Sequence, residues 1–218
     1  LRQELKTGAR VTGGFAGGLT VSSTSTEGQA YGITLVNNAA EVSLTSGITS
    51  SKAEGKKNTY AGYFLLSNGS QSDLHYQESR WEAKSAPNRA YGVWGKLTDE
   101  AVATLDLGKS SGDVRSEQNY AYAKRIETDT RAQLTLTETE STWTVKSGGQ
   151  NAYGLYLLAK GESSVRHQVD TLNWTIEGGQ DKAHKPSICV RAQEVHLLGR
   201  WVKRGLKHEE PLPVRRLT

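Results

Sequence analysis

Short stretches in which apolar and more polar residues alternate recur along the chain. Ile33 and Leu35 follow one copy of an Ala-Tyr-Gly tripeptide, and Leu155 and Leu157 follow a later copy. Alternation with a period of two residues is typical of a half-buried β-strand. No long segment has the 3.6-residue periodicity of an amphipathic helix, so the pattern predicts an all-β chain.

The tripeptide itself returns at a nearly fixed interval. Full or looser copies place its third residue at positions 32, 62, 92, 123, 154 and 185, which gives steps of 30 or 31 residues. A period in this range indicates structural units that stack on one another.

Each unit carries two further patches in the same phase. One is rich in Thr, Val and Leu, as at residues 103–107 and 134–136, and such composition favours strands. In the other patch, Trp81, Trp143 and Trp174 lie on a lattice of step 31, and Gly112 occupies the missing node. Three strands per unit, with equivalent residues returning in every unit, predict a parallel β-helix.

The predicted fold is therefore a β-solenoid of about six coils of 30–31 residues, with three strands in each coil. Neighbouring coils would stack about 4.8 Å apart, with columns of Trp, Tyr and Leu inside. An antiparallel domain of hairpins is the alternative, although it would not require Trp to return at equal steps.

The repeat pattern also suggests boundaries. We expect residues 1–18 to be an N-terminal cap or an incomplete coil, 19–189 to be the solenoid, and 190–218 to be a basic C-terminal tail or cap. Because the chain has no Met, we expect it not to begin at its own start codon.

Composition fits a thin solenoid better than a compact globule, since only 35% of the 218 residues are hydrophobic and 7% are aromatic. The formal net charge of +4 falls entirely on residues 190–218, where seven Arg and Lys residues face three Glu residues. We expect no nucleic-acid partner for the solenoid, and the tail is either a capping segment or one that touches phosphate or a membrane surface. Cys189 is the only cysteine, so no disulfide can form within the chain.

Candidate catalytic carboxylates are isolated on this lattice. Asp99 and Asp106 have no second carboxylate one period further along, whereas β-helices that cleave polysaccharides need a carboxylate pair or a calcium site. The five His residues show no metal-ligand spacing, and His184 takes a tyrosine position. We predict no catalytic residue, no metal site and no cofactor.

Charged residues also repeat at steps of 31. Lys84, Arg115 and Lys146 form a basic row, which is the predicted binding site for anionic glycans or another acidic surface. The alternative is a solvated face that binds nothing. A second set alternates acid and base and is expected to stabilise the fold: Glu100, Arg131 and Glu162.

Degenerate coils of this size that carry Ala-Tyr-Gly and then alternating Ile or Leu, as at 30–35 and 152–157, resemble the passenger regions of Gram-negative autotransporters. The similarity covers roughly residues 19–189, and the scarcity of cysteine adds to it. The resemblance implies a right-handed parallel β-helix, display on the bacterial cell surface or secretion, a role in adhesion or virulence, and an outer-membrane barrel beyond this chain. It carries over no functional residue.

These observations favour a non-enzymatic surface scaffold or adhesin. It would bind a host glycan or protein, or copies of itself, through one repetitive face, where weak contacts sum by multivalency. A β-helical polysaccharide lyase or glycoside hydrolase is the second hypothesis, and a segment of a purely structural fibre is the third.

Overall fold

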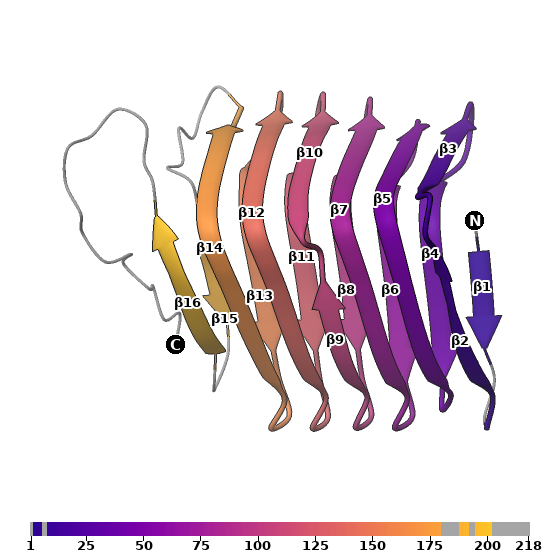
Figure 1. The fold of residues 1–218 in the computed structure, drawn as a ribbon. Helices are drawn as coiled ribbons and strands as arrows, with labels where there is room; N and C mark the ends of the chain where they lie inside the picture. The colour runs from indigo at the N-terminus through magenta and orange to yellow at the C-terminus, as the bar shows by residue number, and fades with distance from the viewer. Residues whose placement is uncertain (1, 6–7, 180–187, 192–194, 202–218) are drawn as a thin grey trace.

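The computed structural model describes residues 2–5, 8–179, 188–191 and 195–201. These residues form strands and turns, and no helix occurs among them. The strands build a β-solenoid of about six turns, with two parallel sheets that face each other across a narrow core (Figure 1). The predicted all-β solenoid is therefore confirmed, and the hairpin alternative is excluded because the neighbouring strands of both sheets run parallel.

The seven-stranded sheet contains one short strand from each turn of the solenoid, starting at the Ala-Tyr-Gly position. Its strands, in spatial order, are β1 (Arg2–Leu5), β4 (Ala30–Asn38), β6 (Thr59–Ser67), β8 (Ala90–Leu97), β11 (Ala121–Thr128), β13 (Ala152–Ala159) and β15 (Ile188–Arg191).

The nine-stranded sheet contains the longer strands, which face the viewer in Figure 1. Its members are β2 (Arg10–Phe15), β3 (Leu19–Ser25), β5 (Glu41–Gly55), β7 (Gln71–Ser85), β9 (Val102–Asp106), β10 (Lys109–Ser116), β12 (Gln133–Ser147), β14 (Ser164–Glu177) and β16 (Val195–Trp201).

The second and third patches of the sequence pattern form one continuous strand in most coils. The strands β5, β7 and β12 each run for 15 residues through both patches. The patches separate into β9 and β10 where Gly108 adopts a positive φ of 56°, a conformation that interrupts a regular strand. Three strands per coil are thus visible only where such an interruption occurs.

Register confirms the internal tryptophan column. Gly112 pairs with Trp81 on one side and with Trp143 on the other, and Trp143 pairs with Trp174. Trp81 and Trp143 are buried in the core, and Trp174 packs against it.

The Trp143 indole explains two glycines. A Cβ atom on Gly112 would lie 2.4 Å from this ring, and one on Gly92, in the opposite sheet, would lie 2.3 Å from it. Gly92 is the glycine of an Ala-Tyr-Gly copy. In this copy and in the one that ends at Gly154, where Trp174 is the neighbour, the motif ends in glycine because an indole from the other sheet occupies the space of a side chain.

Turns at one end of the coils share an unusual backbone. In the turns at residues 67–70, 98–101, 129–132 and 160–163, both central residues have positive φ and the first carbonyl accepts a hydrogen bond from the fourth N–H. This is the signature of a type I′ turn, which favours Asn-Gly. Only the turn at 67–70 has that sequence, with Asn68 and Gly69.

The division into cap, solenoid and tail stays a prediction. Within the segment expected as a tail, β16 pairs with β14, whereas His184 and residues 202–218 lie outside the described part of the chain. Among the residues described, no helix is long and apolar enough to cross a membrane.

Candidate functional site

The predicted basic row is brought together on the outer face of the nine-stranded sheet. Arg115 on β10 stands in register between Lys84 on β7 and Lys146 on β12. Two of these cations already form ion pairs with acidic neighbours. Arg115 contacts Asp113 at 2.6 Å, and Lys146 contacts Glu177 at 2.9 Å. Hydrogen bonding to Asp113 raises the pKa of Arg115.

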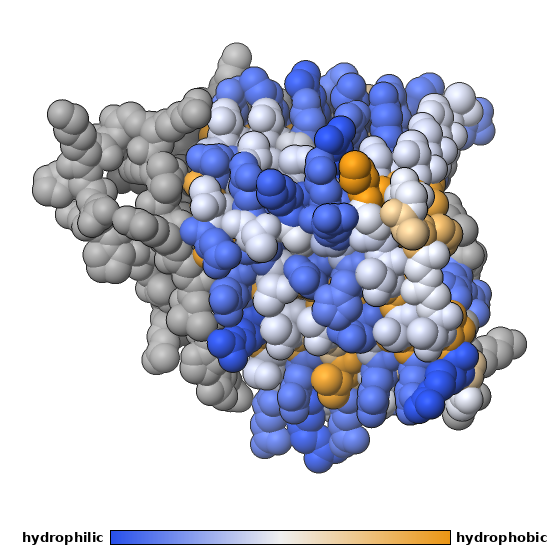
Figure 2. Space-filling model, in the orientation of Figure 1, coloured by the Kyte–Doolittle hydropathy of each residue, from blue (hydrophilic) through white to orange (hydrophobic). Residues whose placement is uncertain are grey.

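Charges of both signs surround this row. Figure 2 shows the same face, which is mostly hydrophilic. The outward positions on the C-terminal halves of β5, β7, β12 and β14 and along β10 carry six cations and six anions: Lys52, Arg80, Lys84, Lys109, Arg115 and Lys146, with Glu54, Glu78, Glu82, Asp113, Glu140 and Glu177. Opposite charges this close largely cancel beyond a Debye length, so the row does not form a field of one sign.

Asp106 has a neighbour that the sequence comparison missed. Its register partner on the preceding coil is His75, whose Nδ1 lies 3.5 Å from an Asp106 oxygen and whose Nε2 lies 2.9 Å from an Asp73 oxygen. Partial burial opposes the charge, but the two carboxylates outweigh it and raise the pKa of His75. The two acids lie on opposite nitrogens of the ring, an arrangement that orients the imidazole but does not converge on one metal position.

The acid–base ladder at the turns is present in part. Arg131 and Glu100 form an ion pair, and both side chains are more than half exposed. An exposed pair of this kind contributes only about 0–1 kcal/mol. Asp99 lies in the same turn as Glu100.

Contrary to the prediction, the tyrosines of the repeated tripeptide do not lie in the main core with the tryptophans, although three of them are buried. Tyr60, Tyr91 and Tyr122 form a cluster separate from the core, and Tyr31 at its end is 36% exposed. Two consecutive residues, such as Gly92 and Val93, both point inward, and the register of paired residues skips the glycine position. This irregularity breaks the alternation, so the residue before the glycine points outward.

On the outside, the tyrosines form a continuous stack along the solenoid. Ring centroids of successive members lie 4.8–5.1 Å apart with interplanar angles of 10° or less. The stack comprises Tyr31, Tyr60, Tyr91, Tyr122 and Tyr153. Burial raises the pKa of Tyr60 to about 12, so this ring is uncharged at neutral pH.

A second column runs beside the tyrosine stack. Tyr63, Trp94, Arg125 and Tyr156 are successive register partners on β6, β8, β11 and β13, and all four are half-buried. Their rings meet the tyrosine stack edge to face. The Arg125 guanidinium lies 5.3 Å from the Tyr122 ring centre and 5.0 Å from that of Tyr156.

We call the stack and the second column together the outer aromatic face. Tyr, Trp and Arg are the residue types that most often dominate binding at protein interfaces. The sequence did contain a signal for this face, since Trp94 lies next to Val93 and so falls in the outward phase.

A network of buried charges lies in the core and was not predicted. The Lys124 Nζ donates to Glu138 at 2.7 Å and to Ser141 at 2.8 Å, and His167 Nε2 lies 3.1 Å from the same Glu138 oxygen. The Lys124 ammonium also lies 5.1 Å and 5.0 Å from the ring centres of Trp143 and Trp174. Burial opposes the charge of Glu138, but Lys124 and His167 lower its pKa to about 2.

This network could have been found by comparing coils. Lys124 stands in register with Val93 and Leu155, and His167 stands in register with Leu136. A charge in an otherwise apolar column is a sign of a buried polar network. Lys124 and Glu138 have no exposed side-chain surface, so no substrate reaches them, and the network is part of the core rather than a catalytic site.

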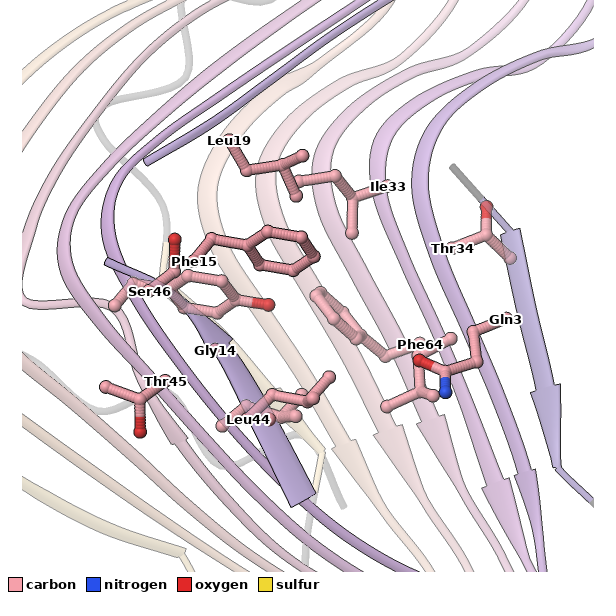
Figure 3. Close-up of a pocket in the computed structure, with 14 residues that line it drawn as sticks. Gln3, Gly14, Phe15, Leu19, Ile33, Thr34, Leu44, Thr45, Ser46 and Phe64 are labelled. Carbon is pink, nitrogen blue, oxygen red and sulfur yellow. The ribbon is translucent and has the colours of Figure 1, made fainter. Parts of the chain in front are cut away.

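An apolar cavity of about 360 Å³ opens in the first coil. Phe15, Leu19, Ile33, Leu44 and Phe64 are among its lining residues (Figure 3). Gly13, the register partner of Leu44, also lines the cavity.

The described residues contain no group of three or more His, Cys, Asp or Glu side chains that could hold a metal ion. Comparison with protein-family models, curated proteins and solved structures gives no match for this chain.

Proposed function

We propose that this chain is a non-catalytic binding scaffold that presents the outer aromatic face to a partner at a cell surface or in the extracellular space. The observation that supports it is the second column, in which half-buried Tyr, Trp and Arg side chains repeat on four successive strands. These side chains pack on the tyrosine stack, outside the main core, and part of each stays accessible to a partner.

Repetition suits binding by many weak contacts. Each coil presents one aromatic or guanidinium group at a spacing set by the strands, about 4.8 Å, so a partner lying along the solenoid axis meets several such groups together. Contacts that are individually weak then add within one rigid surface. The proposal agrees with the adhesin-like role, the host glycan or protein partner and the surface localisation expected from the resemblance to autotransporter passengers.

The outer aromatic face and the basic row can be tested against each other. We expect the labelled chain to bind cultured epithelial cells, and a Tyr63→Ser, Trp94→Ser, Tyr156→Ser variant to lose at least about tenfold in binding, because aromatic anchors dominate interfaces. A matched variant on the other sheet, Arg80→Ser with Lys109→Ser, keeps wild-type binding. Equal binding by wild type and the aromatic variant, measured by flow cytometry, would refute the proposal.

An enzymatic role has its own measurement. If a panel of acidic polysaccharides is cleaved by the chain, and cleavage is lost in an Asp106→Asn variant, the non-catalytic proposal is wrong.

A further inference from the structure

The residues exposed on the outer aromatic face form a pattern that is nearly the same when the coils are taken in reverse order. The second column follows the order Tyr63, Trp94, Arg125 and Tyr156. Two residues further along the strands, a third column follows the order Leu65, Lys96, Glu127 and Leu158. In both columns the ends are alike, and the two central residues are complementary: an indole beside a guanidinium, and an ammonium beside a carboxylate.

We propose that this face binds a second copy of the same chain, related by a two-fold axis that runs parallel to the strands between β8 and β11. This inference rests on the proposed function, since it names the partner of the same face. A rotation of 180° about that axis reverses the order of the coils but keeps each residue at its position along the strand. Such a two-fold contact uses the same patch on both copies.

The rotation brings complementary groups together at four central points. Each Trp94 faces Arg125 of the second copy, an arrangement that favours a cation–π contact. Each Lys96 faces Glu127 of the second copy. Glu127 already pairs with Arg125 of its own chain at 2.6 Å, so in the dimer each Glu127 gains a second cation, the Lys96 of the second copy. At the edges, aromatic and aliphatic side chains face their own kind, because Tyr63 meets Tyr156 and Leu65 meets Leu158.

The same operation on the nine-stranded sheet gives the opposite result. Its basic row is flanked in register by acids, in the order Glu54, Lys84, Arg115, Lys146 and Glu177. A two-fold axis through β10 would place Arg115 against Arg115 and each acid against the other acid. Like charges in register oppose association, so the two-fold contact is specific to the outer aromatic face.

The size of the face predicts a weak dimer. Four strands spaced about 4.8 Å apart, each with about eight residues at about 3.3 Å, cover about 500 Å² per copy. The total buried surface is then about 1,000 Å², the lower end of the range for specific interfaces. We therefore expect a dissociation constant on the order of tens of micromolar.

Charge reversal tests the geometry in sedimentation velocity experiments over a concentration series. We expect wild type to dimerise, and Lys96→Glu alone and Glu127→Lys alone each to weaken dimerisation at least about tenfold, because each places like charges opposite each other. An equimolar mixture of the two single variants is expected to form a heterodimer of wild-type affinity, since every facing pair is again of opposite sign. Lys109→Glu on the other sheet is the control that leaves dimerisation unchanged.

Recovery in the mixture also shows that both single variants are folded. Two results would overturn the inference: a wild-type chain that stays monomeric up to about 1 mM, or a mixture that associates no better than either variant alone. In the first case, if binding to cells still depends on Tyr63, Trp94 and Tyr156, the proposed function stands and only the partner is wrong.

Discussion

The buried ion pair makes a sharp prediction because its two charges have no contact with solvent. The Lys124 and Glu138 side chains are both 0% exposed and lie 2.7 Å apart. Replacing one partner leaves the other charge in the core without its counter-ion. We expect Glu138→Gln to lower the free energy of unfolding by about 3–5 kcal/mol, the usual cost of breaking a buried pair from one side.

The pKa of Glu138 gives an independent magnitude. Its pKa in the fold is about 2, against an ordinary value of 4.5. A difference of that size corresponds to about 3 kcal/mol, at 1.36 kcal/mol for each pH unit. Because the pKa of the folded state is lowered, this stability is present above pH 4.5 and is lost as the pH falls toward 2. The usual cost of breaking a buried ion pair and the pKa shift of Glu138 therefore give a stabilisation of the same order of magnitude.

Replacing the whole network should act in the opposite direction. The apolar residues in register with Lys124, Glu138 and His167 are Leu155, Val169 and Leu136. A Lys124→Leu, Glu138→Val, His167→Leu variant removes every buried charge of the network together. We expect its stability to equal that of wild type or to exceed it by about 1–4 kcal/mol, since the cost of desolvating the ions disappears.

Urea and thermal unfolding followed by circular dichroism measure both effects. For a chain of this length, 1 kcal/mol shifts Tm by about 2–4 °C, so Glu138→Gln should lower Tm by roughly 6–20 °C. Its stability should also vary less between pH 4.5 and pH 2 than that of wild type. The argument about buried charge is wrong if Glu138→Gln unfolds within about 2 °C of wild type. It is also wrong if the triple variant is less stable than the Glu138→Gln variant.

Three further predictions follow from the turns, the core and the basic row. Thr130→Asn should raise the unfolding free energy by about 1 kcal/mol, because Thr130 has φ of 50° and Asn tolerates that conformation better than a β-branched residue. A loss of stability in chemical denaturation would contradict this. Gly112→Ala should cost about 1–3 kcal/mol, whereas Gly95→Ala, whose Cβ would lie 3.1 Å from a flexible Ile side-chain end, should change stability by less; equal losses in thermal melts would contradict the packing argument. Lys84→Glu with Lys146→Glu should reduce retention on heparin at low salt, and unchanged retention would remove the basic row as an anion site.

Most of the fold could be predicted because a solenoid repeats its register. The equal sequence spacing of Trp81, Trp143 and Trp174 predicted that they stack, and in the structure these positions and Gly112 are register partners on neighbouring strands. The period alone could not show that two patches join into one strand, since that depends on whether the backbone between them stays extended. In the coil that contains Gly108 it does not.

The position of the tyrosines could not be obtained from alternation. Tyr91 and Val93 are two residues apart, so a regular strand would place both on one side. The structure places them on opposite sides, because Gly92 and Val93 both point inward against the core. A single irregular residue in each coil thus moves an entire column of aromatic rings from the inside to the outside.

Stability and binding can be separated within the outer aromatic face. Tyr91 and Tyr122 are only 2% and 4% exposed, so a partner cannot reach much of either ring. Their repetition is explained by stacking, which contributes about 0.5–1.5 kcal/mol for each aromatic pair. Trp94 and Arg125 also pack within the chain, since Trp94 stacks on Tyr63 with ring centres 4.7 Å apart and Arg125 pairs with Glu127 at 2.6 Å. Unlike Tyr91 and Tyr122, however, both are only half-buried, so a partner can reach part of each side chain. The case for a binding face therefore depends on the second column, and substitutions of Trp94 should affect association more than stability.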